Sequence, residues 1–412
     1  MIQLIEKIEG EAQLHFSLTK QKAIEFVNIE FFSTRNIEKI LQKKAALDAL
    51  VINPRVCGIC GHAHLIATVK ALENCYENLE LTQKAKTIRE LTLNFEIIQN
   101  HFKWFYLTIL PLLGEKHHLL KATQPSQILA KAIATLGGQY PHTSYAIPGG
   151  ITSEITVMDN IRVQNYLSEV ENYFYTNILH ANNLNSLLQE NGDFNILFKK
   201  LQKSGWEHSG KSHNRFIVFG QNSYFKQGEL FDEAIRTELS IEDVQEYQNE
   251  TSLAKNVYYK NRYYEVGPLS RSLLKQLPLI QESYERYGDS ILTRILARVY
   301  EIPQLLQHSK KLLQDMNMDE STYIEPHTPL LQITASGIGI VEAARGTLIH
   351  KVSIEKGIIQ EYEIITPTQW NLSNGTKINP AIAQKAIIGE TDMQLAELIF
   401  KSFDVCSVCT TH

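Results

Sequence analysis

The chain has 412 residues, 43% hydrophobic and 21% charged, so it is long enough to bury a large core. Its formal net charge is −5 and no basic stretch stands out, which argues against a nucleic-acid partner. No apolar run reaches the ~18 residues that cross a bilayer, and the first residues lack the features of a signal peptide. A partner subunit could still direct export, so the compartment stays undecided between cytoplasm, membrane surface and export.

Hydrophobic periodicity predicts short strands followed by a mostly helical first half. Residues 1–32 alternate apolar and polar side chains, which is typical of strands. Residues 37–50 have helical periodicity, which the dipeptide Asn53-Pro54 interrupts. Helical periodicity then recurs in four longer stretches, at residues 62–75, 82–113, 125–136 and 153–189.

The second half mixes strands and helices. Strands are expected near residues 215–219 and 258–265, and two helices between residues 270 and 316. Later come a hairpin, with strands at 347–354 and 360–365, and a helical stretch at 379–403. Repeats and linkers are absent from the sequence. We therefore expect one domain over residues 1–412 of the α+β class, predominantly α, with a large helical core and small peripheral β-sheets.

Four of the five cysteines form two Cys-x-x-Cys pairs near opposite ends of the chain. The pairs and the histidines that follow them are Cys57 and Cys60 with His64, and Cys406 and Cys409 with His412. Two thiolates from one turn can bind the same soft metal ion. Two such pairs predict one metal site that the fold assembles.

From the cysteines alone, three kinds of site remain open. They are a structural zinc, an iron–sulfur cluster, and a thiolate-bound nickel or iron redox centre. Zinc pairs usually lie within tens of residues of each other. Closing the loop of about 350 residues between Cys60 and Cys406 would cost roughly 5 kcal/mol in a flexible chain. Metal analysis distinguishes these alternatives.

Several motifs together resemble the large subunit of nickel–iron hydrogenases. They are Lys7-Ile-Glu-Gly10, Arg35-Asn-Ile-Glu38, residues 55–64, residues 264–271, Glu342-Ala-Ala-Arg345-Gly, Thr366–Asn371 and residues 404–412. These motifs follow the family's order from residue 7 to residue 412, so the resemblance covers the chain. It implies the family's fold and an enzyme that interconverts H2 with protons and electrons. It also implies a mature form, ending at the motif histidine after removal of a C-terminal extension.

The resemblance implies that the four paired cysteines hold a Ni–Fe centre. Cys57 and Cys406 would be terminal ligands of nickel, and Cys60 and Cys409 would bridge to an iron that carries carbonyl and cyanide ligands. Polarizable thiolates suit this soft, redox-active site. Cys406 is also the implied acceptor of the first proton from H2.

Other residues take roles from the same resemblance. Glu9 is the implied proton relay to solvent. Without the motif, a glutamate on a strand would usually be a solvent-exposed carboxylate with no catalytic role. Arg345 would donate to one iron-bound cyanide and Thr368 would bind the other. His64 would hydrogen-bond a bridging sulfur, and Asp404 is the recognisable acid that remains near the metals.

A second metal ion is implied beside the first. Glu38, His412 and a backbone carbonyl near Ile364 would bind Mg2+ or another hard divalent ion, with water completing the coordination. Otherwise Glu38 is a plain glutamate on the surface of a helix.

The sequence departs from the family at five positions, two of which are Lys7 and Glu11, where the family usually has arginine and histidine. Leu112 stands where many members have an aspartate facing the arginine, and Ala344 and Val405 replace prolines. These changes keep open a regulatory hydrogen sensor with the same metal site. A scaffold subunit with a structural four-cysteine zinc is the second alternative.

The resemblance also implies an obligate partner, a small subunit that carries iron–sulfur clusters. A four-iron cluster usually needs four thiolates, and this chain has only Cys75 outside the two pairs. Electrons would therefore leave through another polypeptide, and the family allows further electron-transfer subunits.

Overall fold

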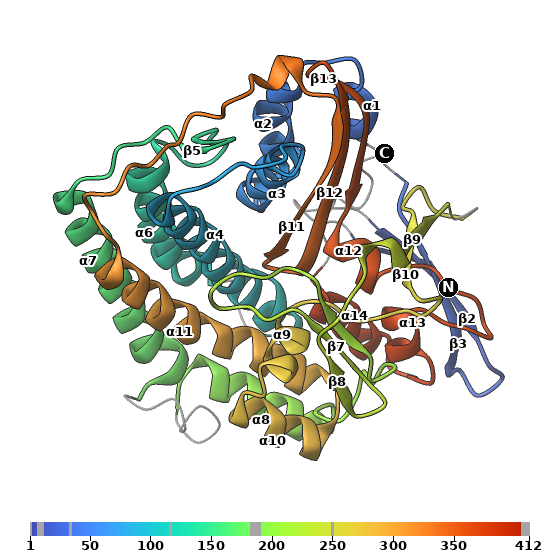
Figure 1. The fold of residues 1–412 in the computed structure, drawn as a ribbon. Coiled ribbons are helices and arrows are strands. Elements are labelled where there is room, and N and C mark those ends of the chain that lie inside the picture. Colours follow the sequence, from blue (N-terminus) through green and yellow to red (C-terminus); the bar gives the residue numbers. More distant parts are fainter. Residues whose placement is uncertain are drawn as a thin grey trace.

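The computed structural model describes residues 2–5, 12–32, 35–114, 118–181, 191–248 and 251–404. Helices predominate in these residues, and five small antiparallel sheets lie around them (Figure 1). The predicted α+β class with a large helical core and small sheets is confirmed.

The first strands follow the predicted alternation. Strands β1 (Ile2–Ile5), β2 (Ala12–Leu18) and β3 (Ile24–Glu30) form an antiparallel sheet in that order. Ala12, Leu14 and Phe16 are buried, whereas Gln13 and His15 between them are only half-buried. This alternation is what a sheet with one covered face requires.

The single helix predicted over residues 37–50 is wrong. The chain instead forms α1 (Ile37–Leu41), η1 (Ala46–Asp48), α2 (Ala49–Ile52) and η2 (Asn53–Arg55). Between α1 and η1, the Lys43 N–H donates to Ile359 O at 2.8 Å, and Ala45 forms a bridge with Ile358. These bonds to a distant strand replace the helical bonds of residues 42–45, which interrupts the helix.

Long helices build the core. They are α3 (Gly61–Glu73), α4 (Gln83–Trp104), α6 (Leu119–Gly137), α7 (Val157–Tyr173) and α11 (Ile291–Asp315). Helix α4 packs against α6 and α11, and α6 packs against α7 (Figure 1). The predicted helix at 82–113 continues past α4 through the π-helical turn η3 (Phe105–Ile109) into α5 (Leu110–Leu112).

Three helices, not the expected two, lie between residues 268 and 315. They are α9 (Pro268–Leu274), α10 (Pro278–Tyr287) and α11. Gln276 has a φ of 56° and Pro278 begins α10, so the chain cannot continue α9 as a regular helix.

Shorter elements complete the middle of the chain. They are β4 (Ala146–Ile147), β5 (Gly150–Ile151), η4 (Phe174–Leu179), α8 (Asp193–Ser204), β6 (Phe216–Val218), β7 (Gly228–Phe231), β8 (Ala234–Arg236), η6 (Ile241–Asp243), β9 (Val244–Tyr247), β10 (Asn256–Tyr259) and η7 (Leu330–Gln332). The strands predicted near 215–219 and 258–265 correspond to β6 and β10, the second only in part.

The sheet of β11 (Ala335–Ala343), β12 (Gly346–Glu355) and β13 (Ile358–Ile365) lies against α3. The predicted hairpin is β12–β13, and β11 adds a third strand. A Cβ on Gly337 would lie 2.1 Å from Ala71 O, and one on Gly339 would lie 1.9 Å from Ala67 O. Strand β11 therefore touches the α3 backbone and runs toward the N-terminal end of that helix.

The last described helices are α12 (Pro367–Asn371), α13 (Ile382–Ile387) and α14 (Met393–Ser402). The helical stretch predicted at 379–403 is thus two helices, separated around Gly389, which has a φ of 96°. In the part of the chain that the structure describes, no helix combines the length and hydrophobicity needed to span a membrane.

Candidate active site

Cys57 and Cys60 lie together in the turn between η2 and α3, and both are buried. The Ile59 N–H donates to Cys57 Sγ at 3.4 Å, so the backbone of the turn already bonds one sulfur. A Cβ on Gly61 would lie 2.2 Å from Pro54 O, so the turn folds back onto η2 at a distance that only glycine permits. The predicted first cysteine pair is therefore a compact, buried turn at the start of a helix.

Side chains from other elements hold this turn. Arg35 Nη1 donates to Val56 O at 2.7 Å, and Asn100 Nδ2 of α4 donates to Ile59 O at 3.0 Å. Glu96, one turn before Asn100, accepts 2.9 Å bonds from two backbone N–H groups in the first turn of α3, those of His62 and Ala63. Burial raises the pKa of Glu96 to about 8, although these two hydrogen bonds oppose the shift. Sequence reasoning missed Glu96 and Asn100.

His64 belongs to a buried network that the sequence did not predict. Its Nδ1 lies 3.0 Å from His350 Nε2 on β12, and His350 Nδ1 lies 2.8 Å from the Tyr362 hydroxyl on β13. Burial lowers the pKa of His64 to about 4, against the opposing effect of the nearby Cys57 thiolate, so the imidazole is neutral at pH 7. The predicted hydrogen bond from His64 to a bridging sulfur stays a prediction.

Arg345 lies in the tight turn between β11 and β12, where an ion pair of 3.1 Å joins its Nε to Asp404 Oδ2. Arg298 of α11 donates to the same oxygen at 2.6 Å, and its guanidinium lies 4.5 Å from the centre of the Trp104 ring. All three charged side chains are buried. Asp404 thus pairs with Arg345 and Arg298, and neither contact was predicted from the motifs.

Thr368 lies in the first turn of α12. The Thr366 side chain and Gln369 form a capping box that starts this helix. Thr368 is buried, and within the described ranges its Oγ1 has no hydrogen-bond partner. Since a buried hydroxyl is normally bonded, Thr368 is suited to a ligand that this chain binds.

Of the three departures predicted near Arg345, the structure describes two, Leu112 and Ala344. Leu112 is half-buried at the end of α5 and offers only its carbonyl, which accepts from Gln394 Nε2 at 2.8 Å. Ala344 is buried, and its carbonyl lies 3.4 Å from Arg271 Nη2. Val405 lies outside the described residues.

Glu38 and Ile364 are in contact, through the backbone N–H of Ile364, and the second predicted metal site stays a prediction. The Ile364 N–H donates to Glu38 Oε1 at 2.8 Å. Lys255 Nζ lies 3.5 Å from Glu38 Oε2 and 3.6 Å from Glu246 Oε2, so one ammonium bridges two carboxylates. Burial raises the pKa of both acids, that of Glu246 to about 7, while Lys255 opposes the shift. Lys255 and Glu246 have no motif that would have indicated them.

Four predicted residues lie outside the described residues, namely Glu9, Cys406, Cys409 and His412. Within residues 12–404, less the gaps given above, no three His, Cys, Asp or Glu side chains gather as a metal site. Of the four cysteines predicted to bind the metal, the structure describes two, Cys57 and Cys60.

Comparison with known proteins identifies the family. The sequence model of the family described as "Nickel-dependent hydrogenase" matches residues 35–110 and 202–412, more than half of the chain. The chain belongs to the nickel-dependent hydrogenases. It is the catalytic large subunit of such an enzyme, an oxidoreductase that acts on H2.

Relatives of this hydrogenase chain match it over most of its length. It is 23% identical to the alpha subunit of the coenzyme F420 hydrogenase of Methanothermobacter thermautotrophicus, over 98% of this chain and 92% of that protein. It is 27% identical to the alpha subunit of sulfhydrogenase 2 of Pyrococcus furiosus, over 88% and 86%. The Ni-Fe-Se hydrogenase of Desulfomicrobium baculatum has the same fold, with a TM-score of 0.85 over 100% of both chains at 20% identity.

The described residues fit a Ni–Fe site. Two buried thiols lie in a turn held by Arg35 and Asn100. The buried guanidinium of Arg345 and the buried hydroxyl of Thr368 offer donors to groups bound beside them. Soft sulfur ligands suit a thiolate-bound redox metal better than a hard ion.

Proposed function

We propose that Cys57, Cys60, Cys406 and Cys409 hold a Ni–Fe centre whose iron carries carbonyl and cyanide ligands. The observation that carries this proposal is the buried turn of Cys57 and Cys60 in a chain of this family. Strand β11 runs along α3 toward that turn and ends at Ala343, two residues before Arg345. When bound, the centre would supply the redox chemistry that splits H2 into a proton and a hydride equivalent.

The polar side chains near this turn have separate tasks in the proposal. Arg345 donates to one cyanide and Thr368 to the other. Asp404 keeps the Arg345 guanidinium in place through the 3.1 Å ion pair. His64, neutral at pH 7, hydrogen-bonds a bridging sulfur without adding a charge. These donors would hold the iron ligands in a site from which bulk water is excluded.

Protons leave through side chains of this chain. Cys406 accepts the first proton, and Glu9 passes it toward solvent. Glu9→Gln keeps the size and polarity of the side chain but removes its titrating group. This variant should lose H2 turnover and H/D exchange with solvent while its metal content stays normal. Unchanged exchange in Glu9→Gln would show that protons leave by another route.

Glu38, His412 and the backbone carbonyl near Ile364 would bind Mg2+ or a similar ion. The burial of Glu38 and its 2.8 Å bond to the Ile364 N–H support this proposal. An octahedral hard ion accepts one carboxylate, one carbonyl and one imidazole together with water. Glu38→Gln should lower the Mg2+ content of the purified protein, and an unchanged content would contradict the proposal.

Electrons would leave through a partner subunit that carries iron–sulfur clusters. The relatives above are named as subunits, and this chain has one thiol outside the two pairs, Cys75. Burial raises the pKa of Cys75 to about 11, so it stays a protonated thiol. If the purified chain alone reduced a large protein acceptor with H2 at full rate, the partner would be unnecessary.

Metal analysis and infrared spectroscopy test the centre itself. The purified protein should contain nickel and iron, and it should show carbonyl and cyanide stretches that ordinary protein lacks. Cys60→Ala should lose both metals, whereas Cys75→Ala, a matched buried cysteine, should keep them. Zinc in place of nickel would indicate a non-catalytic scaffold subunit with a structural zinc site instead. Normal infrared bands with very slow H2 turnover would indicate a hydrogen sensor, the alternative that the departures at Leu112, Ala344 and Val405 keep open.

A further inference from the structure

The chain from Val266 to Arg271, here called the 266–271 segment, leads into α9 and contacts the turn that carries Arg345. A Cβ on Gly267 would lie 2.8 Å from Arg345 O, and one on Gly346 would lie 2.5 Å from the Val266 side chain. Both glycines have positive φ angles, 117° and 129°, which other residues rarely adopt. The two backbones therefore meet with no room for a side chain between them.

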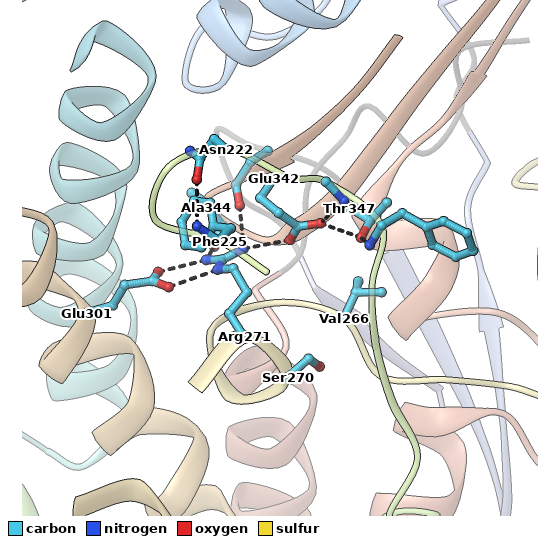
Figure 2. Close-up of polar contacts among 12 residues, drawn as sticks. Asn222, Phe225, Val266, Ser270, Arg271, Glu301, Glu342, Ala344 and Thr347 are labelled. Carbon is cyan, nitrogen blue, oxygen red and sulfur yellow. Dashed lines mark hydrogen bonds and ion pairs between the residues drawn. The ribbon is translucent and has the colours of Figure 1, made fainter. Parts of the chain in front are cut away.

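Arg271 makes a second contact with the same turn, one helical turn further along. Its Nη1 donates to Ala343 O at 2.9 Å, and its Nη2 lies 3.4 Å from Ala344 O (Figure 2). These are the two carbonyls immediately before Arg345. Because a guanidinium is planar and rigid, bonding both carbonyls restricts the direction in which the chain enters Arg345.

Arg271 is itself fixed by two carboxylates. Glu301 of α11 accepts 2.8 Å and 2.7 Å bonds from its Nε and Nη2, and Glu342 of β11 accepts a 3.1 Å bond from its Nη1 (Figure 2). Thr347 donates to the other Glu342 oxygen at 2.6 Å. Burial alone would lower the pKa of Arg271, but the two carboxylates raise it, so the group stays charged. This fixed cation is anchored on α11 and β11 at the same time.

The 266–271 segment also contacts the helix that carries Thr368. The Val266 N–H donates to Asn371 Oδ1 at 3.0 Å, and Asn371 Nδ2 donates back to Val266 O at 3.0 Å. Asn371 is the last residue of α12, three positions after Thr368. One short segment is thus bonded to both elements that present the proposed cyanide-binding side chains.

We propose that the 266–271 segment sets the relative position of Arg345 and Thr368, and that Arg271 is the positioning residue for Arg345. The inference rests on the proposed function, because those two side chains matter in this way only if they donate to iron-bound cyanides. Arg271 acts on Arg345 through the backbone carbonyls of residues 343 and 344.

The test uses Arg271→Lys in the complete purified complex. Lysine keeps the charge but loses the planar fork that bonds Glu301 and the two carbonyls. We expect the cyanide bands to shift, with nickel and iron content unchanged and turnover reduced roughly 10–100-fold, as small misplacements of catalytic groups commonly cause. Arg345→Lys, measured beside it, shows which bands respond to loss of the Arg345 guanidinium.

Arg89→Lys is the matched control. Arg89 is buried, pairs with both oxygens of Glu73 at 2.9 Å and 2.8 Å, and bonds the Ile147 and Gly150 carbonyls, so it resembles Arg271 in its contact types. It holds the β4–β5 hairpin and not the Arg345 turn. Arg89→Lys should therefore leave the cyanide bands unchanged even if it lowers stability.

The outcomes separate this inference from the proposed function. If the wild type lacks nickel and cyanide bands, the proposed function fails. If the bands are present and move in Arg345→Lys but not in Arg271→Lys, the inference is overturned. If Arg271→Lys does not accumulate as folded protein, Glu342→Gln is measured in its place. This variant removes the ion pair of Arg271 with Glu342 and keeps the one with Glu301. Unshifted bands in Glu342→Gln would then overturn the inference, and shifted bands would support it.

Discussion

Glu301→Gln should destabilise this hydrogenase subunit far more than an exposed Glu→Gln change. Glu301 accepts two bonds from Arg271 and lies 2.7 Å from His101 Nε2, and all three side chains are buried. Each carboxylate oxygen faces a donor, so an amide NH2 in either position would face N–H groups. The substitution also leaves Arg271 buried with one carboxylate instead of two.

The expected loss follows from that geometry. Removing one partner of a buried ion pair costs about 3–5 kcal/mol, because the other charge stays buried. The entropy of unfolding, about 2.1 cal/mol/K per residue, amounts to about 0.9 kcal/mol/K for a chain of this length. The melting temperature should therefore fall by roughly 3–6 °C. Glu25→Gln, which breaks the exposed 3.0 Å pair with Lys377, should lower it by no more than about 1 °C.

The pH dependence gives a second measurement by scanning calorimetry. Burial opposes ionisation of Glu301, but Arg271 and His101 outweigh it and lower its pKa to about 2 from 4.5. A carboxyl whose pKa is depressed on folding stabilises the protein above the unfolded pKa and loses this effect as the pH falls toward the folded pKa. The difference between wild type and Glu301→Gln should be constant from pH 8 to about 5 and shrink only below about pH 4.5. Equal melting temperatures at pH 7 would refute the reasoning.

Two further predictions concern contacts around the site. Gly339→Ala should lower the melting temperature and weaken metal retention, because its methyl would lie 1.9 Å from Ala67 O and force β11 away from α3. Thermal scans and metal analysis of the purified variant check this. A melting temperature and metal content equal to those of the wild type would show that the backbone can move to accommodate the methyl. In Lys255→Met, added Mg2+ should raise the melting temperature more than in wild type, since Glu38 and Glu246 lose the ammonium that now bridges them. An equal or smaller Mg2+ response would contradict that expectation.

Motifs predicted side chains better than they predicted their partners. The sequence indicated Arg345, Asp404 and Thr368, and the structure buries all three, with the first two in contact. It gave no sign of Arg298, which lies 106 residues from Asp404 along the chain, or of His350, which lies 286 residues from His64. Periodicity reports which face of an element is buried but not which distant element covers it.

Local pattern also failed where distant backbone groups decided the structure. Residues 37–50 have helical periodicity, yet Lys43 and Ala45 bond to the chain at Ile358 and Ile359 instead. The hairpin of β12 and β13 was predictable because its turn, Lys356-Gly357, is local and its φ angles of 47° and 70° suit such residues. Strand β11 was missed as a strand, since glycines dilute its apolar pattern.

The glycine contacts between β11 and α3 have a consequence for how this enzyme can evolve. Helix α3 begins just after the cysteine turn, and β11 ends two residues before Arg345. The two elements meet backbone to backbone at Gly337 and Gly339. Their separation is therefore set by main-chain atoms and not by the volume of interposed side chains. Any side chain larger than hydrogen at either position would push the two elements apart. Substitution there is therefore constrained, because the spacing between the helix after the cysteine turn and the strand before Arg345 depends on two missing methyl groups.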